Sequence, residues 1–568
     1  MPSLTHGQSP EPRPAANPPP GHDPPCILHE DDHLLVVHKP PGWNTHAPSP
    51  WAGEGIYDWL RNREPRWARL AIVQRLDKET SGVLLFTKTD LANRSLTEQF
   101  AQHRVQKRYV FWTDRPPPRR AWTAETALHR SGPKRRVKPP GPADPTAVTH
   151  FEVDPVPRTI HLPWARGTPW PETIRVWQGH ARPVTGKTHQ IRAHAAAAGI
   201  PILGDALYQG TPWARLCLHA EELQLFHPAT GELIRFYAPA DFLCWPGTAL
   251  RQAIIEPDLT DTCRCIHGAA DGWPGLYVDR LGPCLLAQSG QPLTDLQRSW
   301  LSNLLPARAL YHKILRRRIQ GLPPEELAPR FVQGEPMSAP FLIRENGLRF
   351  ELNLGEGYSV GLFLDQRDNR RRLLTGCIGR HFLLRDPAAT DRAGPWEVLN
   401  TFAYTCGFSV AAAAAGARVT SLDLSRKYLD WGRRNFQHNG LDPAAHDFIH
   451  GDVRDWLRRF QRRNRRFHLV LLDPPTFSRS KSGGVFRVEK DLPALVASAA
   501  SLLLSHGVLF ISSNKEDWAP ADFVATVHQA IETAGRAIVQ ELYAPQPPDF
   551  PVHPDEPAYL KTLWCRLD

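Results

Sequence analysis

Asp77 is the first residue of the chain whose surroundings suggest chemistry. It lies in the segment Arg75-Leu76-Asp77-Lys78-Glu79-Thr80-Ser81-Gly82, between an apolar residue and a Thr-Ser-Gly turn. Turns favour Asp, Thr, Ser and Gly for purely structural reasons, so a structural role is the alternative. An ionised aspartate can also act as a nucleophile, provided that a neighbouring cation keeps it charged.

A second set of candidates stands at the ends of apolar segments in the C-terminal half. Residues 398–408 (VLNTFAYTCGF) form a small-residue turn before an Ala-rich helix, where a ligand can approach a helix N-terminus. Asp423, Asp452 and Asp473 each follow a further apolar segment, and a carboxylate at a second strand suits the hydroxyls of a ribose. Each feature alone is typical of a turn or a cap. Together they indicate the ligand edge of an α/β sheet. NAD would suit the same acid, but Gly-x-Gly-x-x-Gly is absent.

Alternating strands and helices are needed to position these residues. Apolar runs at 34–37, 83–86 and 109–112 predict strands around Asp77. In the C-terminal half the pattern alternates, which predicts a parallel, doubly wound sheet. Strands are expected at 397–399, 419–422, 468–472 and 508–511, with helices at 409–415, 428–439 and 491–505.

The composition limits the class of protein. The chain has 568 residues, so more than one core is expected, and its net charge of +10 permits a polyanionic partner. No apolar run approaches the roughly 18 residues of a membrane span, and the N-terminus lacks a signal pattern. The nine scattered cysteines predict a reducing, cytoplasmic location with free thiols and no zinc site.

Proline and arginine mark the expected boundaries. Residues 1–25 are a Pro-rich leader that we expect to be disordered. Residues 113–148 are predicted to be a basic loop or insertion, either a solvated surface or a nucleic-acid contact. The Pro-punctuated stretch at 240–262 is a candidate domain boundary. The arginine runs at 316–318 and 458–466 are either solubilising faces or phosphate contacts.

Four ordered segments of the N-terminal half resemble the RluA family of pseudouridine synthases over about residues 27–240. They are the Asp77 segment and residues 185–194 (TGKTHQIRAH), 199–205 (GIPILGD) and 216–220 (LCLHA). The resemblance implies that Asp77 is the nucleophile, that Arg192 is its ion-pair partner and that no cofactor is used. It also implies that Tyr109 stacks on a flipped base and assists proton removal at C5. Gln74 stands where the family has histidine, which keeps hydrogen bonding but loses the option of charge.

The remainder, about residues 262–568, resembles class I S-adenosylmethionine-dependent methyltransferases, and among them the ribosomal RNA large-subunit group of the RlmI and RlmK type. Residues 271–276 (DGWPGL) and 279–282 (DRLG) match in an accessory domain, and residues 361–367 (GLFLDQR) and 400–405 (NTFAYT) in the core. Cys406 replaces the family's usual glycine. No metal is expected. The resemblance implies catalytic roles for Asp473, Pro474, Pro475 and Phe477. It implies that S-adenosylmethionine is bound by Asp365, Gln366, Arg367, Asn400, Phe402, Tyr404, Gly407, Asp423, Ser425, Asp452 and Asp473.

The atom that accepts the methyl group can be argued from cysteine placement. Methylation of cytosine C5 needs a cysteine nucleophile, which RlmI-like enzymes carry after the strand that follows Asp-Pro-Pro. Here that position is Ser512-Ser513-Asn514-Lys515, without cysteine. Residues 473–481 resemble RlmK instead, which implies guanine N7, whose free lone pair needs only positioning. Exocyclic amines of guanine or adenine are the alternatives.

The sequence therefore predicts a multidomain, bifunctional RNA-modifying enzyme. We expect an α+β pseudouridine synthase domain with a mixed antiparallel sheet and a central cleft (26–245), a small α+β accessory RNA-binding domain (262–355) and an α/β Rossmann-like methyltransferase domain (356–568). The expected partner is RNA, most of all 23S ribosomal RNA or the precursor of the large subunit. Alternatives are transfer RNA for the synthase half, or a single catalytic half with the other as an RNA-binding module. The residues around Asp77 and Asp473 argue against a pure RNA chaperone.

Overall fold

The computed structural model describes residues 23–141, 146–162, 165, 171–316, 323–357, 359–385, 395–479 and 485–568. Most of the predicted leader lies outside these ranges, as do Arg317, Arg318 and Lys481. Within the described ranges, no helix combines the length and the apolar character that crossing a membrane requires.

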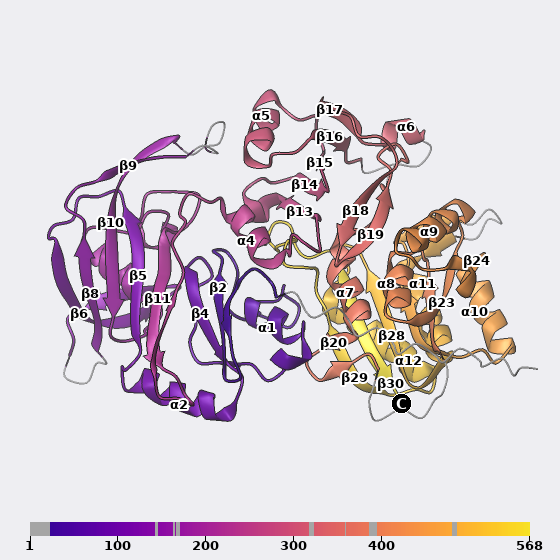
Figure 1. Ribbon diagram of the computed structural model, residues 1–568, viewed down its shortest axis with the longest axis horizontal. Coiled ribbons are helices and arrows are strands. Elements are labelled where there is room, and N and C mark those ends of the chain that lie inside the picture. The colour runs from indigo at the N-terminus through magenta and orange to yellow at the C-terminus, as the bar shows by residue number, and fades with distance from the viewer. Residues whose placement is uncertain are drawn as a thin grey trace, which may run out of the picture.

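The N-terminal part, residues 23–240, is built on a mixed twelve-stranded sheet (Figure 1). Its main path is β1-β2-β4-β11-β5-β10-β8-β6-β7, and among the strands that the structure describes there only β4 and β11 pair in parallel. The strands are β1 Ile27–Glu30, β2 Leu34–Lys39, β3 Ala71–Ile72, β4 Ser81–Thr87, β5 Gln106–Thr113, β6 Ala121–Ser131, β7 Lys134–Lys138, β8 Thr146–Val153, β9 Arg158–His161, β10 Thr173–Pro183, β11 Leu218–Phe226 and β12 Leu233–Tyr237. The three predicted strands are confirmed as parts of β2, β4 and β5.

Helices α1 Ile56–Arg61, α2 Asp90–Ala101 and α3 Gln190–Ala197 pack around this sheet. Gly82 permits the parallel pairing of β4 with β11. Its φ is +123°, and a Cβ there would lie 2.2 Å from the carbonyl oxygen of Ala220. The turn that carries Asp77 therefore leads directly into β4, a strand in the middle of the sheet.

Of the two alternatives for 113–148, a loop or an insertion, the loop is wrong over most of its length. Strands β6 and β7 form a hairpin there, with Gly132 at φ +60° in its turn, and β8 begins at Thr146. Apart from Pro133 in the turn, residues 121–138 contain no proline, and their side chains alternate between more and less exposed positions. The alternating pattern of these side chains therefore predicts the observed strands, whereas the high charge had suggested a loop.

A smaller mixed sheet, β13-β14-β15-β16-β17, lies between the two larger parts (Figure 1). Helix α4 occupies the predicted boundary at 240–262, and the hairpin β18–β19 leads into the C-terminal part. The elements are α4 Pro246–Ile254, β13 Thr262–His267, β14 Leu276–Leu281, β15 Cys284–Ser289, α5 Asp295–Leu304, β16 Ala309–Ile314, α6 Pro324–Leu327, β17 Arg330–Gly334, β18 Phe341–Glu345 and β19 Leu348–Leu352.

The C-terminal part contains a seven-stranded sheet of order β24-β23-β22-β25-β28-β30-β29. Its first five strands are parallel and β30 is antiparallel to both neighbours, which confirms the predicted doubly wound sheet. The helix expected to reach 505 ends at Ala500, because β28 already begins at Leu503. The strands are β22 Trp396–Thr401, β23 Ala417–Asp423, β24 Asp447–His450, β25 Phe467–Leu472, β28 Leu503–Ser513, β29 Ile538–Tyr543 and β30 Lys561–Leu567.

Helices pack on both faces of this sheet, and their apolar sides form its core. They are α7 Arg367–Thr375, α8 Gly407–Ala414, α9 Arg426–His438, α10 Val453–Arg462, α11 Val488–Ala500 and α12 Pro520–Thr533. A 3₁₀ turn, η4 Leu364–Gln366, precedes α7, and two small hairpins are β20 Cys377–Gly379 with β21 Phe382–Leu383, and β26 Phe477–Arg479 with β27 Val485–Arg487.

Candidate active sites

The turn that carries Asp77 is held on both sides by side chains. The hydroxyl of Thr45 donates to the carbonyl of Leu76 (2.9 Å) and accepts from its amide (3.3 Å). The ammonium of Lys39, which is fully buried, donates to the carbonyl of Lys78 (3.0 Å). The residues before and after Asp77 are therefore fixed, and its half-buried carboxylate has a defined position.

A guanidinium from α3 faces this carboxylate. Arg192 donates through Nε and Nη2 to the two oxygens of Asp205 (2.7 and 2.8 Å), and its Nη1 lies 3.2 Å from Oδ2 of Asp77. The pair of bonds fixes the plane of the guanidinium. The predicted partners Asp77 and Arg192 are thus brought together. Asp205 was missed as a functional residue, although its place beside Gly204 in a matched segment was a usable signal.

Tyr109 and His189 complete the surroundings of Asp77. Burial and the nearby charge of Asp77 raise the pKa of Tyr109 above its ordinary value, so the side chain stays a neutral phenol. A neutral phenol can pack against a base or form a hydrogen bond, but it is no phenolate base. His189 lies with Nε2 3.7 Å from Oδ2 of Asp77, and burial lowers its pKa.

The basic hairpin β6–β7 adjoins the same site. Its Arg135 amide donates to the hydroxyl of Tyr208 (2.7 Å), and the ring of Tyr208 lies 5.4 Å from the Arg192 guanidinium carbon. Gln74 lies at the start of the same turn. Its buried Nε2 has no hydrogen-bond partner among the described residues.

In the C-terminal part, a loop with unusual backbone angles follows β22. Phe402, Tyr404 and Cys406 all have positive φ, between +49° and +63°. The Asp423 carboxylate, at the end of β23, accepts the amides of Tyr404 (2.9 Å) and Ser425 (2.8 Å). Burial raises its pKa. Asp423 therefore shapes the loop, and each oxygen keeps a further lone pair for a ligand hydroxyl.

Two features beside this loop fit a nucleoside that carries an amino acid. Helix α8 begins at Gly407 without a side-chain cap, so its first amides can receive a carboxylate. The Asn400 amide group donates to Ser409 (2.8 Å), whereas its buried Oδ1 has no partner among the described residues. An orphaned acceptor beside a free helix N-terminus suits the ammonium and carboxylate of a methionine moiety.

A pair of carboxylates marks the neighbouring strand end. Burial raises the pKa of Asp473 to about 6, with Asp365 adding to the effect, although Ser512 and Gln366 both donate to the Asp473 carboxylate. Burial also raises the pKa of Asp365, which accepts the hydroxyl of Tyr559 (2.9 Å). Asp365, Gln366 and Asp473, which come from distant parts of the chain, are thus brought together.

Other candidates have structural partners. Arg367 donates both terminal nitrogens to Asp549 (2.8 Å each) and is buried, so its guanidinium is already paired within the protein. Asp452 and Ser425 accept amides at the starts of α10 and α9, as caps do. Beyond Asp473, Pro474 is buried, whereas Pro475 and Phe477 are exposed.

Cys406 lies in the loop but is no nucleophile. Burial raises the pKa of its thiol to about 12. Its sulfur faces Gly432 on α9, where a Cβ would lie only 2.3 Å from Sγ. In the described part of the chain, no three His, Cys, Asp or Glu side chains are grouped as a metal site would need.

Comparison with known proteins identifies both halves. Residues 33–197 match the RNA pseudouridylate synthase family, and residues 303–566 match the S-adenosylmethionine-dependent methyltransferase family. Ribosomal RNA large subunit methyltransferase I of Klebsiella pneumoniae is 34% identical over 329 residues, which are 56% of this chain and 76% of that protein. Ribosomal RNA large subunit methyltransferase K of Neisseria meningitidis is 34% identical over 203 residues, 35% of this chain and 53% of that protein. The solved structure titled human RNA pseudouridylate synthase domain containing 4 is 24% identical. The match spans 40% of this chain and 92% of that chain, with a TM-score of 0.29.

Proposed function

Because the chain belongs to the S-adenosylmethionine-dependent methyltransferase family that includes ribosomal RNA large subunit methyltransferase I, and also carries an RNA pseudouridylate synthase domain, we propose that both halves modify one RNA. The proposed reactions are isomerisation of uridine to pseudouridine and methylation of guanine at N7. The contact of Asp77 with a guanidinium that Asp205 holds in place supports the first reaction most strongly.

In the synthase half, we assign nucleophilic attack to Asp77. Arg192 stabilises its ionised form, because an opposite charge at this distance favours the carboxylate. Tyr109 packs on the extruded base as a neutral phenol. The glycosidic C–N bond breaks, a C–C bond to C5 forms, and the proton lost from C5 is balanced by one gained at N1, so the reaction is an isomerisation that consumes no external reactant.

In the methyltransferase half, S-adenosylmethionine supplies the methyl group when bound. We assign its methionine part to Asn400 and the start of α8 at Gly407, and its ribose to Asp423. The carboxylates of Asp365 and Asp473, with Gln366, face the acceptor base, and Pro475 and Phe477 offer it an exposed apolar surface. We assign Arg367, Ser425 and Asp452 a structural role, in which they stabilise the elements around this site and do not contact the ligand.

The cysteines favour N7 over cytosine C5. The end of β28 holds Ser512 and Ser513, with Asn514 and Lys515 directly after it, and the Cys406 thiol is buried with a pKa of about 12. Attack on C5 would need a thiolate. A lone pair such as guanine N7 needs only alignment with the methyl group.

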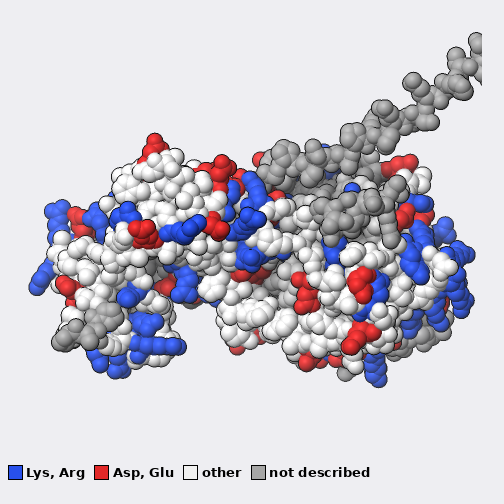
Figure 2. Space-filling view, turned by 90° about the horizontal axis from the view of Figure 1, so that it is seen from below, with Lys and Arg blue, Asp and Glu red and all other residues white. Residues whose placement is uncertain are grey.

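We propose ribosomal RNA of the large subunit as the substrate, since the curated relatives carry this RNA in their names. Basic side chains gather at both ends of the face shown in Figure 2. The α10 segment exposes five arginines and only one acid, a composition suited to phosphate contacts. These are Arg458, Arg459, Arg462, Arg463 and Arg466.

The test is mapping of modified nucleotides in RNA from cells with and without the gene, followed by modification of the unmodified RNA by the purified full-length protein. We expect one or more pseudouridines and 7-methylguanosine in 23S ribosomal RNA. 5-Methylcytosine as the sole methylated product would refute the acceptor. Pseudouridine confined to transfer RNA would refute the shared substrate.

A further inference from the structure

One short segment of the synthase half, residues 43–64, joins the two candidate active sites. At one end its Thr45 holds the turn of Asp77 through Leu76. At the other end, helix α1 faces helix α7 of the methyltransferase half (Figure 1).

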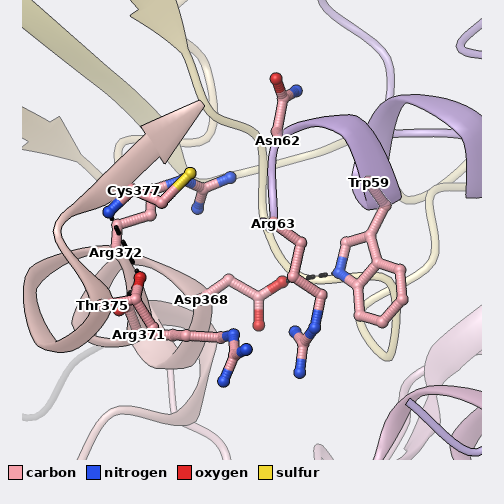
Figure 3. Close-up of a pocket in the computed structure, with 8 residues that line it drawn as sticks. All are labelled: Trp59, Asn62, Arg63, Asp368, Arg371, Arg372, Thr375 and Cys377. Carbon is pink, nitrogen blue, oxygen red and sulfur yellow. Dashed lines mark hydrogen bonds between the residues drawn. The ribbon is translucent and has the colours of Figure 1, made fainter. Parts of the chain in front are cut away.

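The contact between the halves centres on an indole and a carboxylate. Trp59 donates its Nε1 hydrogen to Oδ2 of Asp368 over 3.1 Å, and Figure 3 shows the bond beside a small pocket. Trp59 is 3% exposed and Asp368 is 8% exposed, so little water competes for this bond. A hydrogen bond to a buried charge is stronger than one between neutral groups.

Ion pairs surround this bond and also cross between the halves. Arg371 of α7 pairs with Glu64, and Arg372 lies 4.0 Å from Glu54. Burial raises the pKa of Asp368, but the charges of Arg367, Arg372 and Arg63 outweigh it and leave the pKa below its ordinary value. Asp368 is therefore an ionised acceptor that the synthase half completes.

Asp368 lies in the first turn of α7, two residues after Gln366, which faces Asp473. The next residue, Asn369, donates to Oε1 of Gln366 (2.7 Å), and Gln366 Nε2 lies 3.4 Å from Oδ1 of Asp473. The position of this turn therefore sets where the Gln366 amide meets the Asp473 carboxylate. An ångström-scale displacement of such a group is enough to slow a reaction that depends on alignment.

We propose that Trp59 is a positioning residue for methyl transfer, supplied by the synthase half. Its N–H fixes Asp368, and through the first turn of α7 it holds Gln366 against Asp473. The synthase half thus helps to position the methyl-transfer site, in addition to delivering RNA. This inference rests on the methyl-transfer site proposed above.

The test uses two full-length variants, Trp59→Phe and Trp67→Phe. Trp67 is a matched control because it is also fully buried and donates to a carboxylate, Glu30 (3.0 Å), but entirely within the synthase half. Three readouts are taken on each variant: hydrogen exchange over residues 364–375, the methyl-transfer rate at saturating RNA, and pseudouridine formation.

We expect Trp59→Phe to speed exchange over residues 364–375 and to lower the methyl-transfer kcat about tenfold, while pseudouridine formation stays within twofold. Trp67→Phe should leave the exchange of 364–375 and methyl transfer unchanged. Unchanged exchange in Trp59→Phe, or faster exchange with a wild-type methyl-transfer rate, overturns the inference, as do equal effects of both variants.

A second pair covers the case in which Trp59→Phe does not fold. Asp368→Asn keeps an oxygen acceptor for the indole and should retain most methyl transfer, whereas Asp368→Ala should lose it. Equal activities of the two variants contradict the inference. If the wild type transfers no methyl group, the proposed function fails, and the exchange experiment alone still decides whether Trp59 holds α7.

Discussion

Asp205 accepts hydrogen bonds from two nitrogens of the Arg192 guanidinium, at 2.7 and 2.8 Å, so that Nη1 is the nitrogen that contacts the Asp77 carboxylate. The direction of Arg192 is therefore set by a residue that is itself buried. We expect Asp205→Asn to lower pseudouridine formation by about 10–100-fold, since the fork loses its charged partner. The control is Asp154→Asn, which breaks only the exposed pair with Arg158 (3.1 Å). A wild-type rate in Asp205→Asn would contradict this positioning role.

Asp77→Ala should abolish pseudouridine formation and leave RNA affinity nearly intact. The carboxylate is the proposed nucleophile, whereas RNA affinity rests on many phosphate contacts. Measurement of turnover and of RNA binding at one salt concentration separates the two effects. Glu79→Ala removes an exposed carboxylate two residues away and should keep turnover within about threefold. Equal turnover by Asp77→Ala and the wild type would refute the assignment.

The sequence was sufficient to predict the parallel sheet and its acidic strand ends, because a strand precedes or contains each of Asp423, Asp452 and Asp473, and the strands at Asp423 and Asp473 are largely buried. It was insufficient for partners that depend on tertiary structure. Arg367 matches a motif for the cofactor site but points to Asp549, 182 residues away. The contact of Trp59 with Asp368 likewise joins two domains, and no local sequence pattern predicts it.

Cys406→Ala should retain methyl transfer within about threefold, because the thiol is buried, with a pKa near 12, and takes no part in the proposed reaction. Cys406→Gly should change the free energy of unfolding by no more than about 1 kcal/mol. Its φ of +63° favours glycine, whereas the lost sulfur contacts oppose the change. Thermal unfolding and methyl transfer are measured together, with Cys565→Ala as a control for loss of a buried sulfur on β30. Loss of all methyl transfer in Cys406→Ala alone would point to a covalent role.

Asp473 links the methyl-transfer site to pH. Burial raises its pKa to about 6 in the folded chain, against about 3.9 when unfolded, so the folded state holds the proton more tightly. Stability should therefore fall as pH rises from about 4 to above 6. Asp473→Asn, which removes the buried charge, should unfold about 1–3 kcal/mol less readily than the wild type at pH 7.5 and about equally at pH 4.5. Its methyl transfer should nevertheless be lower by tenfold or more, and should lose the rise between pH 5 and 7 that the wild type shows as Asp473 ionises. Asp455→Asn, at an exposed position on α10, is the control and should show neither effect. If Asp473→Asn is less stable than the wild type at both pH values, the carboxylate is better solvated than its burial implies, and the pH dependence of methyl transfer must come from another group.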